Sequence, residues 1–465
     1  MKHLSQDMAG TTAGEALTSR SGDGLVVHTG TGTTISRRGF LAAAGAAAAF
    51  RPSVSLADSH MDWWTQARFG MFIHWGVHTI IARDIWNMEH EAIPPEEYME
   101  LGKKFRPPVG CARTWARLAR EAGQKYMVLT TKNHDGYCLF DTKTTNFCAT
   151  KQACGRDLVA EFVEAARAEG RRVGFYFSMM DWIHPDGIRC AVDEAARRRF
   201  VDYIHAQVNE ICSNYGKIDI LWWDGPWPLN AAEWEAEKLE KHVRELQPDI
   251  IINDRGGTKG DFSTSEQKIE PAKEGRPWEA CMTINNSWGY FAVDHNWKTP
   301  QTIIGNLITC SRGGGNYILN IGPKPDGSVP PDSVRVLQRV GQWTSQYGES
   351  IYGSELCKVT RSNYVNFTRK GNTLYLHVTR WVGPVITLAR FTSKIKSARW
   401  LSTGKAVKFE QARQDDPREP SIGFSLYRVK FTDLPATAPE MIPVIAAEFE
   451  AEPIQDLKFP RWAQK

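Results

Sequence analysis

Residues 65–350 alternate short apolar runs with segments whose apolar side chains recur at helical spacing. In the stretch DLVAEFVEAARAEGRRVGFYFS, Asp157 is suited to cap a helix and Gly170 to end it. Residues 173–178 then form a continuous apolar run of the length of a buried strand. This stretch therefore predicts one helix followed by one buried strand, and the unit before it has the same pattern.

Six further apolar runs in the same region have the length and composition of strands. They lie at residues 70–75, 126–130, 218–223, 249–253, 280–284 and 316–321. Continuous apolar strands that alternate with helices are typical of a parallel sheet covered on both faces. Seven such strands over this length favour a (β/α)₈-like barrel, and an open doubly wound sheet remains the alternative.

The pattern changes near residue 355, where apolar and polar positions begin to alternate with a period of two. Residues 373–379 and 425–431 show this alternation most clearly. We therefore expect a C-terminal all-β sandwich with a structural role. The predicted domains are an N-terminal segment at 1–57, the catalytic barrel at 58–350 and the sandwich at 351–465.

Composition narrows the class of protein. The chain is 42% hydrophobic and 24% charged, which is the balance of a soluble globular protein. Its net charge is only +4 and no basic run is present, so nucleic acid is not an expected partner. The nine cysteines show no CxxC spacing, so no zinc site is predicted, and their disulfide status stays open.

The N-terminal segment carries an export pattern. Residues 36–41 read SRRGFL, and the weakly apolar stretch AAAGAAAAF follows directly. This is the pattern of a twin-arginine signal, whose apolar part is too short to span a bilayer. Small residues precede Asp58, where we expect the mature chain to begin. The protein is therefore predicted to be exported, to the periplasm or beyond, with no stable membrane insertion after the signal is removed.

Polar and aromatic side chains gather at the ends of five predicted strands. They are found in residues 72–76, 131–137, 176–178, 222–225 and 253–255. In a barrel the carboxyl ends of all strands surround one mouth, where active sites form. A single His or Trp at a strand end is usually structural, but five neighbouring strands with such residues indicate a binding site.

The motifs FGMFIHWG, KNHDGYCLF, LWWDG, WEAC and SRGGGNYILNIGP resemble, in order, those of the α-L-fucosidases of glycoside hydrolase family 29. The resemblance implies a retaining exo-α-L-fucosidase that removes terminal fucosyl residues from oligosaccharides or glycoconjugates. Its two-carboxylate chemistry requires neither a metal nor an organic cofactor. Two alternatives stay open: an enzyme that accepts an L-galactoside in the same pocket, and a non-catalytic fucose-binding protein.

The resemblance also assigns roles to acidic residues. Asp224 matches the family's nucleophile, which forms a covalent fucosyl-aspartate. The acid/base lies in a variable stretch after the fifth strand, and we expect Glu266 because a long carboxylate on a loop can reach across the mouth. Glu279 of the WEAC motif is the next candidate, unless it orients its neighbours by hydrogen bonding. Asp261 and Glu270 are weaker candidates.

Seven further residues match positions that line the sugar pocket in the family. They are His74, Trp75, Trp86, His134, Tyr176, Trp222 and Arg255. The sequence departs from the family at Ile85, where a glutamate is common, and at Asn133, where a histidine is common. Trp288 is expected either to touch the leaving group or to belong to the core.

Overall fold

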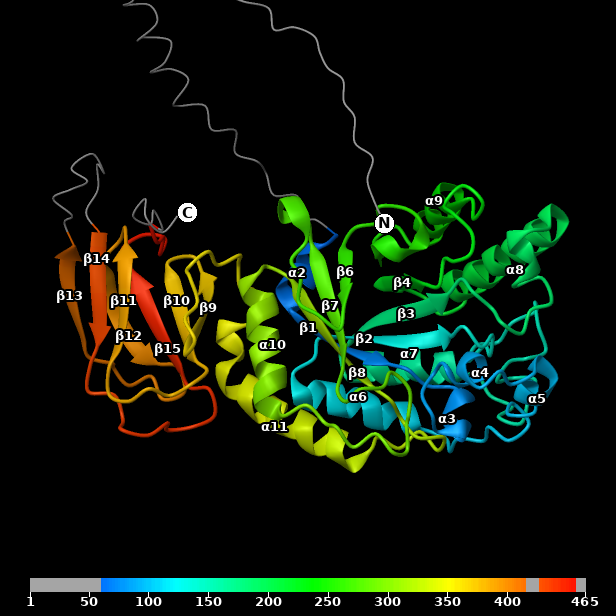
Figure 1. Cartoon of the computed structure of the whole chain (residues 1–465), viewed down its shortest axis with the longest axis horizontal. Coiled ribbons are helices and arrows are strands. Elements are labelled where there is room, and N and C mark those ends of the chain that lie inside the picture. The colour runs from blue at the N-terminus through cyan, green and yellow to red at the C-terminus, as the bar shows by residue number, and fades with distance from the viewer. Residues whose placement is uncertain (1–59, 415–425, 457–465) are drawn as a thin grey trace, which may run out of the picture. The chain divides into compact units, whose positions relative to one another are not determined.

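The computed structural model describes residues 60–414 and 426–456, and the predicted export segment lies outside them. Eight parallel strands follow one another around a barrel in chain order (Figure 1). The strands are β1 (Phe69–Ile73), β2 (Tyr126–Lys132), β3 (Arg172–Ser178), β4 (Ile220–Asp224), β5 (Ile251–Ile252), β6 (Ser263–Glu266), β7 (Trp278–Thr283) and β8 (Asn316–Ile321). Strand β8 pairs with β1. A parallel bridge between Asn253 and Phe262 joins β5 to β6, so the sheet closes and the open-sheet alternative is wrong.

Helices connect most of the strands. They are α2 (Asp62–Ala67), α3 (His78–Ile81), α4 (Asn87–His90), α5 (Pro95–Met99), α6 (Cys111–Ala122), α7 (Leu158–Ala168), α8 (Glu194–Ser213), α9 (Ala236–Leu246), α10 (Pro300–Arg312) and α11 (Pro331–Tyr347). Asp157 caps α7 as predicted, because its side chain accepts a hydrogen bond from the Ala160 amide. Two 3₁₀ turns, η2 (Asp254–Gly256) and η3 (Lys273–Gly275), take the place of α-helices after β5 and β6.

Side chains alternate between two cores along the barrel strands. Phe72, Tyr176 and Trp222 belong to a cluster inside the barrel. Their neighbours in sequence face the surrounding helices, as Ile73 and Phe177 do in the larger cluster outside. This alternation determines which residue at each strand end can reach the mouth of the barrel.

The C-terminal region is all-β, as predicted. It contains β9 (Val365–Lys370), β10 (Thr373–Val378), β11 (Ile386–Phe391), β12 (Ile395–Trp400), β13 (Phe409–Gln414), β14 (Leu426–Phe431) and β15 (Val444–Phe449). These strands form two antiparallel sheets, in the orders β12-β15-β10-β9 and β11-β14-β13. Leu374 and Leu376 pack in the core between the sheets, whereas Tyr375 packs with the barrel's outer cluster. The domain boundaries at 57/58 and 350/351 stay predictions.

All nine cysteines are free thiols, and eight of them are buried. The chain therefore folds around its apolar cores without disulfide bridges. Within residues 60–414 and 426–456, none of the helices is both long enough and apolar enough to cross a membrane.

Candidate active site

A cavity of about 140 Å³ opens at the carboxyl ends of the barrel strands. Eight of the residues predicted for the site line this cavity, and five more complete the wall. The lining residues are Phe72, His74, Ile85, Trp86, His134, Tyr176, Trp222, Asp224, Trp227, Arg255, Glu266, Cys281 and Trp288.

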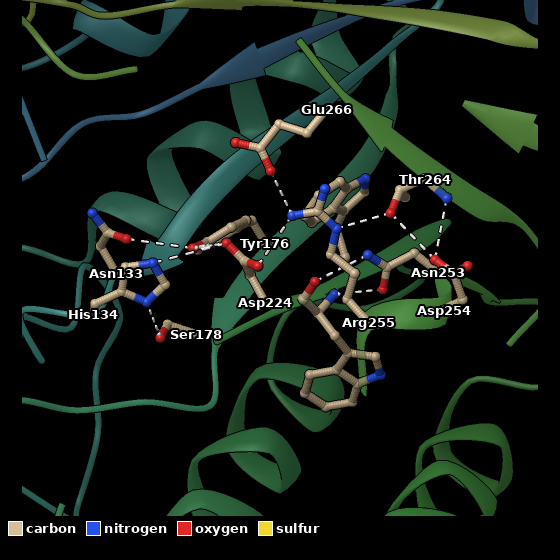
Figure 2. Close-up of polar contacts among 12 residues, drawn as sticks. Asn133, His134, Tyr176, Ser178, Asp224, Asn253, Asp254, Arg255, Thr264 and Glu266 are labelled. Atoms are coloured by element: carbon tan, nitrogen blue, oxygen red, sulfur yellow. Dashed lines mark hydrogen bonds and ion pairs between the residues drawn. The ribbon is translucent and has the colours of Figure 1, made fainter. Parts of the chain in front are cut away.

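Asp224 is the last residue of β4, and three side chains surround its carboxylate (Figure 2). The Tyr176 hydroxyl donates to Oδ2 at 2.9 Å, and Arg255 Nη1 donates to Oδ1 at 3.3 Å. His134 Nε2 lies 3.8 Å from Oδ2. These contacts hold the Asp224 oxygens in place at the mouth of the barrel, where a nucleophile must lie.

Gly225 allows the chain to turn sharply after Asp224. Its φ is +62°, and a Cβ at this position would lie 3.0 Å from His134 Nδ1 and from Ser178 Oγ. A side chain here would press on His134 and Ser178 and would also strain the backbone. The glycine of the LWWDG motif therefore allows the sharp turn that follows the carboxylate.

Arg255 joins Asp224 to Glu266 (Figure 2). Its Nη1 donates to Glu266 Oε2 at 2.9 Å as well as to Asp224, and its Nε donates to Thr264 Oγ1 at 2.8 Å. The guanidinium also lies 4.7 Å from the ring centroid of Trp222. Because one nitrogen contacts both carboxylates, their nearest oxygens lie at most about 6 Å apart, which is compatible with the spacing of about 5 to 5.5 Å in retaining glycosidases.

The sequence indicated that Glu266 lies on a loop, but the structure places it at the end of strand β6. The four residues of this strand, STSE, include no large apolar side chain, so the strand has no hydrophobic pattern. Pairing with β7 specifies it instead, with Glu266 opposite Cys281. The carboxylate is therefore positioned by the barrel itself, and 41% of the side chain remains exposed at the mouth.

Two buried histidines line the cavity. His74 Nδ1 lies 2.7 Å from Asn320 Oδ1, while the Asn320 amide nitrogen donates to a carbonyl. His134 Nδ1 lies 2.7 Å from Ser178 Oγ, whose hydroxyl donates to another carbonyl. Both Nδ1 atoms must therefore be the donors, which leaves Nε2 as an acceptor. Burial lowers the pKa of His134 and lowers that of His74 to about 3, so both rings are neutral.

Trp75 does not line the cavity, because side chains alternate along β1 and its neighbour His74 points inward. Its ring packs against Phe105 and Trp115 in the outer core, at centroid distances of 5.0 and 4.9 Å. Its indole nitrogen donates to the Lys324 carbonyl at 2.8 Å. The structure thus places Trp75 in the packing between the barrel and its helices.

Glu279 also lies outside the cavity, below its floor. It is 1% exposed, accepts a hydrogen bond from Trp222 Nε1 at 3.2 Å and contacts the Tyr126 hydroxyl. Burial raises its pKa to about 7. These contacts match the orienting role that the sequence left open, since Glu279 holds the tryptophan on which Arg255 rests.

The sequence did not identify Phe72, Trp227 or Cys281 as lining residues. The alternation along β1 and β7 could have indicated Phe72 and Cys281, which lie two residues from His74 and Glu279. Trp227 carries no such signal, because it follows the end of β4 in a turn. Asp261 forms ion pairs with Arg244 and His60 away from the cavity, and Glu270 pairs with Lys268 at the surface.

Comparisons with known proteins agree on one family. The family model "Alpha-L-fucosidase" matches residues 41–349. The tissue α-L-fucosidase of Bos taurus is 31% identical over 350 residues, which cover 69% of this chain and 75% of that protein. The human tissue α-L-fucosidase is 30% identical with the same coverage of both chains.

Solved structures show the same likeness. α-L-Fucosidase isoenzyme 1 from Paenibacillus thiaminolyticus is 38% identical, with a TM-score of 0.75 over 84% of this chain and 99% of that one. A trapped covalent intermediate of an α-L-fucosidase from Bacteroides thetaiotaomicron, in complex with 2-fluoro-fucosyl fluoride, is 27% identical, with a TM-score of 0.75. The likeness covers 84% of this chain and 96% of the Bacteroides thetaiotaomicron chain.

Proposed function

Because the chain belongs to the α-L-fucosidases of glycoside hydrolase family 29, it is a retaining α-L-fucosidase, and we propose that Asp224 and Glu266 perform its chemistry. One observation carries this assignment: both carboxylates contact the same guanidinium nitrogen at the mouth of the barrel. A non-catalytic fucose-binding protein has no need for a second carboxylate at this spacing.

In the first step, Asp224 attacks the anomeric carbon of the fucosyl residue and the bond from that carbon to the leaving oxygen breaks. Glu266 donates its proton to the leaving oxygen, and a fucosyl-aspartate ester remains. The Tyr176 hydroxyl and Arg255 hold Asp224 in position for this attack. Burial and the nearby Asp224 raise the pKa of Tyr176 well above its usual value, so its hydroxyl stays a donor.

In the second step, Glu266 accepts a proton from water as the water oxygen attacks the same carbon from the opposite face. The bond to Asp224 breaks, and fucose leaves with its original configuration. Once Asp224 is an ester it carries no charge, so the charge of Arg255 is left to the Glu266 carboxylate. The shared arginine therefore donates to Glu266 at the stage where this residue acts as the base.

The remaining lining residues suit a small sugar with several hydroxyl groups. The Nε2 atoms of His74 and His134 are neutral acceptors for hydroxyl protons. Phe72, Trp222 and Trp288 supply apolar surface for the carbon-hydrogen faces of the ring and its methyl group. We propose that these residues hold the fucosyl residue over Asp224.

The test is azide rescue of two variants on an aryl α-L-fucoside, using the chain from Asp58. We expect Asp224→Gly and Glu266→Gly each to lose at least about 100-fold in kcat and to recover part of it with azide. The products distinguish the roles. With the nucleophile removed, azide attacks from the face of Asp224 and gives the β-fucosyl azide. With the acid/base removed, azide replaces water in the second step and gives the α-fucosyl azide.

The α-fucosyl azide from Asp224→Gly, or the β-fucosyl azide from Glu266→Gly, would contradict the assigned roles. Asp261→Gly is the matched control, since Asp261 is a nearby acid that lies outside the cavity. Its catalytic rate should not respond to azide. A wild-type chain without turnover on the aryl fucoside would contradict the catalytic proposal.

We also propose that the protein is exported in a folded state through a twin-arginine route. The proposal rests on the SRRGFL pattern and the short apolar stretch behind it, in residues that the structure does not describe. Replacing Arg37 and Arg38 by lysine should retain the protein in the cytoplasm with its activity intact. Unchanged appearance of the variant outside the cytoplasm would contradict the proposal.

A further inference from the structure

Exposure along the cavity wall distinguishes its floor from its mouth. His74, Tyr176 and Trp222 are 3% exposed or less and lie deep. Among the thirteen lining residues, Trp227 and Glu266 are the two classed as exposed, at 42% and, for the glutamate side chain, 41%. A substrate whose sugar lies on the floor must therefore leave the cavity past these two side chains.

Trp227 is held firmly although it is exposed. Its ring centroid lies 5.3 Å from that of His134, and it stacks nearly parallel to Trp86 at 6.4 Å and 11°. The turn that carries it is fixed by Trp234, which is fully buried and donates from its indole nitrogen to the Pro226 carbonyl. The flat ring is thus presented to solvent in one orientation, at little cost in entropy when a ligand binds.

Exposure of this indole has no counterpart in the rest of the described chain. Of the large apolar side chains that are exposed within residues 60–414 and 426–456, Trp227 is the only aromatic one. An exposed tryptophan at the rim of a binding cavity commonly marks a ligand contact, because burying it would otherwise stabilise the fold. Trp227 lines the same cavity as the proposed acid/base and is exposed as that residue is, which indicates the part of the ligand that it meets.

We propose that Trp227 forms a subsite for the sugar to which fucose is attached, a neutral hexopyranosyl residue that stacks a carbon-hydrogen face on the indole. The subsite rests on the proposed function, since Glu266 protonates the oxygen between the two sugars and that oxygen must lie at the mouth. The second sugar then occupies the exit between Glu266 and Trp227. Binding in this subsite stabilises the transition state only when the leaving group is a sugar.

The test compares two substrates that differ only beyond the fucosyl residue. α-L-Fucosyl fluoride has a leaving group too small to reach the subsite, whereas an α-L-fucosyl-galactose disaccharide fills it. We expect Trp227→Ala to lower kcat/KM for the disaccharide about tenfold or more, and for the fluoride by no more than about twofold. Trp227→Phe keeps a flat ring and should lose only about threefold on the disaccharide.

Two controls separate this subsite from other effects. Val293→Ala also removes an exposed apolar side chain, 72% exposed and outside the cavity, and should change neither kcat/KM. The thermal midpoint of Trp227→Ala should lie close to that of the wild type. Equal losses on both substrates would place Trp227 in the fucose site and overturn the subsite, as would no loss on either. A wild type inactive on the fluoride would instead overturn the proposed function, and the subsite with it.

Discussion

At the scale of single residues, the site depends on one arginine whose surroundings leave it little freedom. Arg255 is held by Thr264 on one side and rests on Trp222, so its Nη1 points between Asp224 and Glu266. Trp222 is in turn fixed by Glu279 from below. This chain of contacts gives Glu279 an effect on catalysis without any contact to the substrate.

Glu279→Gln therefore tests the assignment of the acid/base. An amide keeps both contacts, since its oxygen can accept from Trp222 and its nitrogen can donate to Tyr126. We expect kcat/KM on an aryl fucoside to fall less than about threefold in Glu279→Gln, whereas Glu266→Gln should lose about 100-fold or more on a disaccharide. A larger loss in Glu279→Gln than in Glu266→Gln would reverse the two roles.

The same glutamate predicts a dependence of stability on pH. Burial raises the pKa of Glu279 from 4.5 to about 7, so the folded state binds this proton more tightly than the unfolded state. Its contribution is fully present below about pH 4.5 and is lost as the pH rises through about 7. The free energy of unfolding of the wild type, relative to Glu279→Gln, should fall by about 2 kcal/mol between pH 5 and pH 8. Urea unfolding of both proteins measures this difference, and parallel pH profiles would contradict it.

At the scale of elements, the barrel was predictable where its strands are apolar. The runs at 126–130 and 173–178 correspond to β2 and β3, and the period of two explains why His74 reaches the cavity and Trp75 does not. Strand β6 was not predictable from its own residues, which are polar. It is ordered by pairing with β7, and the local sequence carries no signal of that pairing. The sequence motif therefore located Asp224, while the position of Glu266 required the closed barrel.

A β-bulge in β2 is another feature that periodicity alone missed. Thr130 pairs with Tyr176, but Lys132 pairs with the next residue of β3, Phe177, so the strand gains one residue at the bulge. Lys132 consequently faces the outer core, where its Nζ lies 3.5 Å from Asp181 Oδ2. The Asp181 carboxylate anchors the following loop by accepting from the His184 amide at 3.0 Å.

Loss of the Lys132 charge should therefore destabilise the fold. Lys132 is 0% exposed, so Lys132→Met leaves the Asp181 carboxylate buried without its cation, at an expected cost of about 3 kcal/mol in the free energy of unfolding. Adding Asp181→Asn removes that charge and should recover part of the loss. A double-mutant cycle by urea denaturation measures the coupling, and strictly additive effects would contradict the ion pair.

At the scale of the whole molecule, the barrel and the C-terminal sheets share packing surface. Trp343 of α11 is 3% exposed and donates from its indole nitrogen to the Ile442 carbonyl at 3.0 Å. Tyr375 of β10 and Val444 of β15 belong to the same buried cluster as Trp343. One face of the four-stranded sheet is thus covered by the barrel's outer helix, which supports the structural role expected for this region.

Trp343→Ala tests that role. Removing this side chain creates a cavity in the shared core, and we expect the free energy of unfolding to fall by about 3 kcal/mol or more. The activity of the folded variant on an aryl fucoside should be unchanged, because Trp343 does not line the cavity. A loss of kcat/KM with unchanged stability would indicate instead that the C-terminal region acts on catalysis.

Trapping the covalent intermediate would identify directly the residue that attacks the sugar, which we assign to Asp224. The intact protein is treated with 2-fluoro-fucosyl fluoride, digested, and mapped by mass spectrometry. We predict one added 2-fluoro-fucosyl group per chain, attached to Asp224 in the peptide containing LWWDG, and none in Asp224→Asn. An adduct on Glu266, Glu279 or another carboxylate, or turnover of the wild type without any adduct, would show that Asp224 is not the nucleophile.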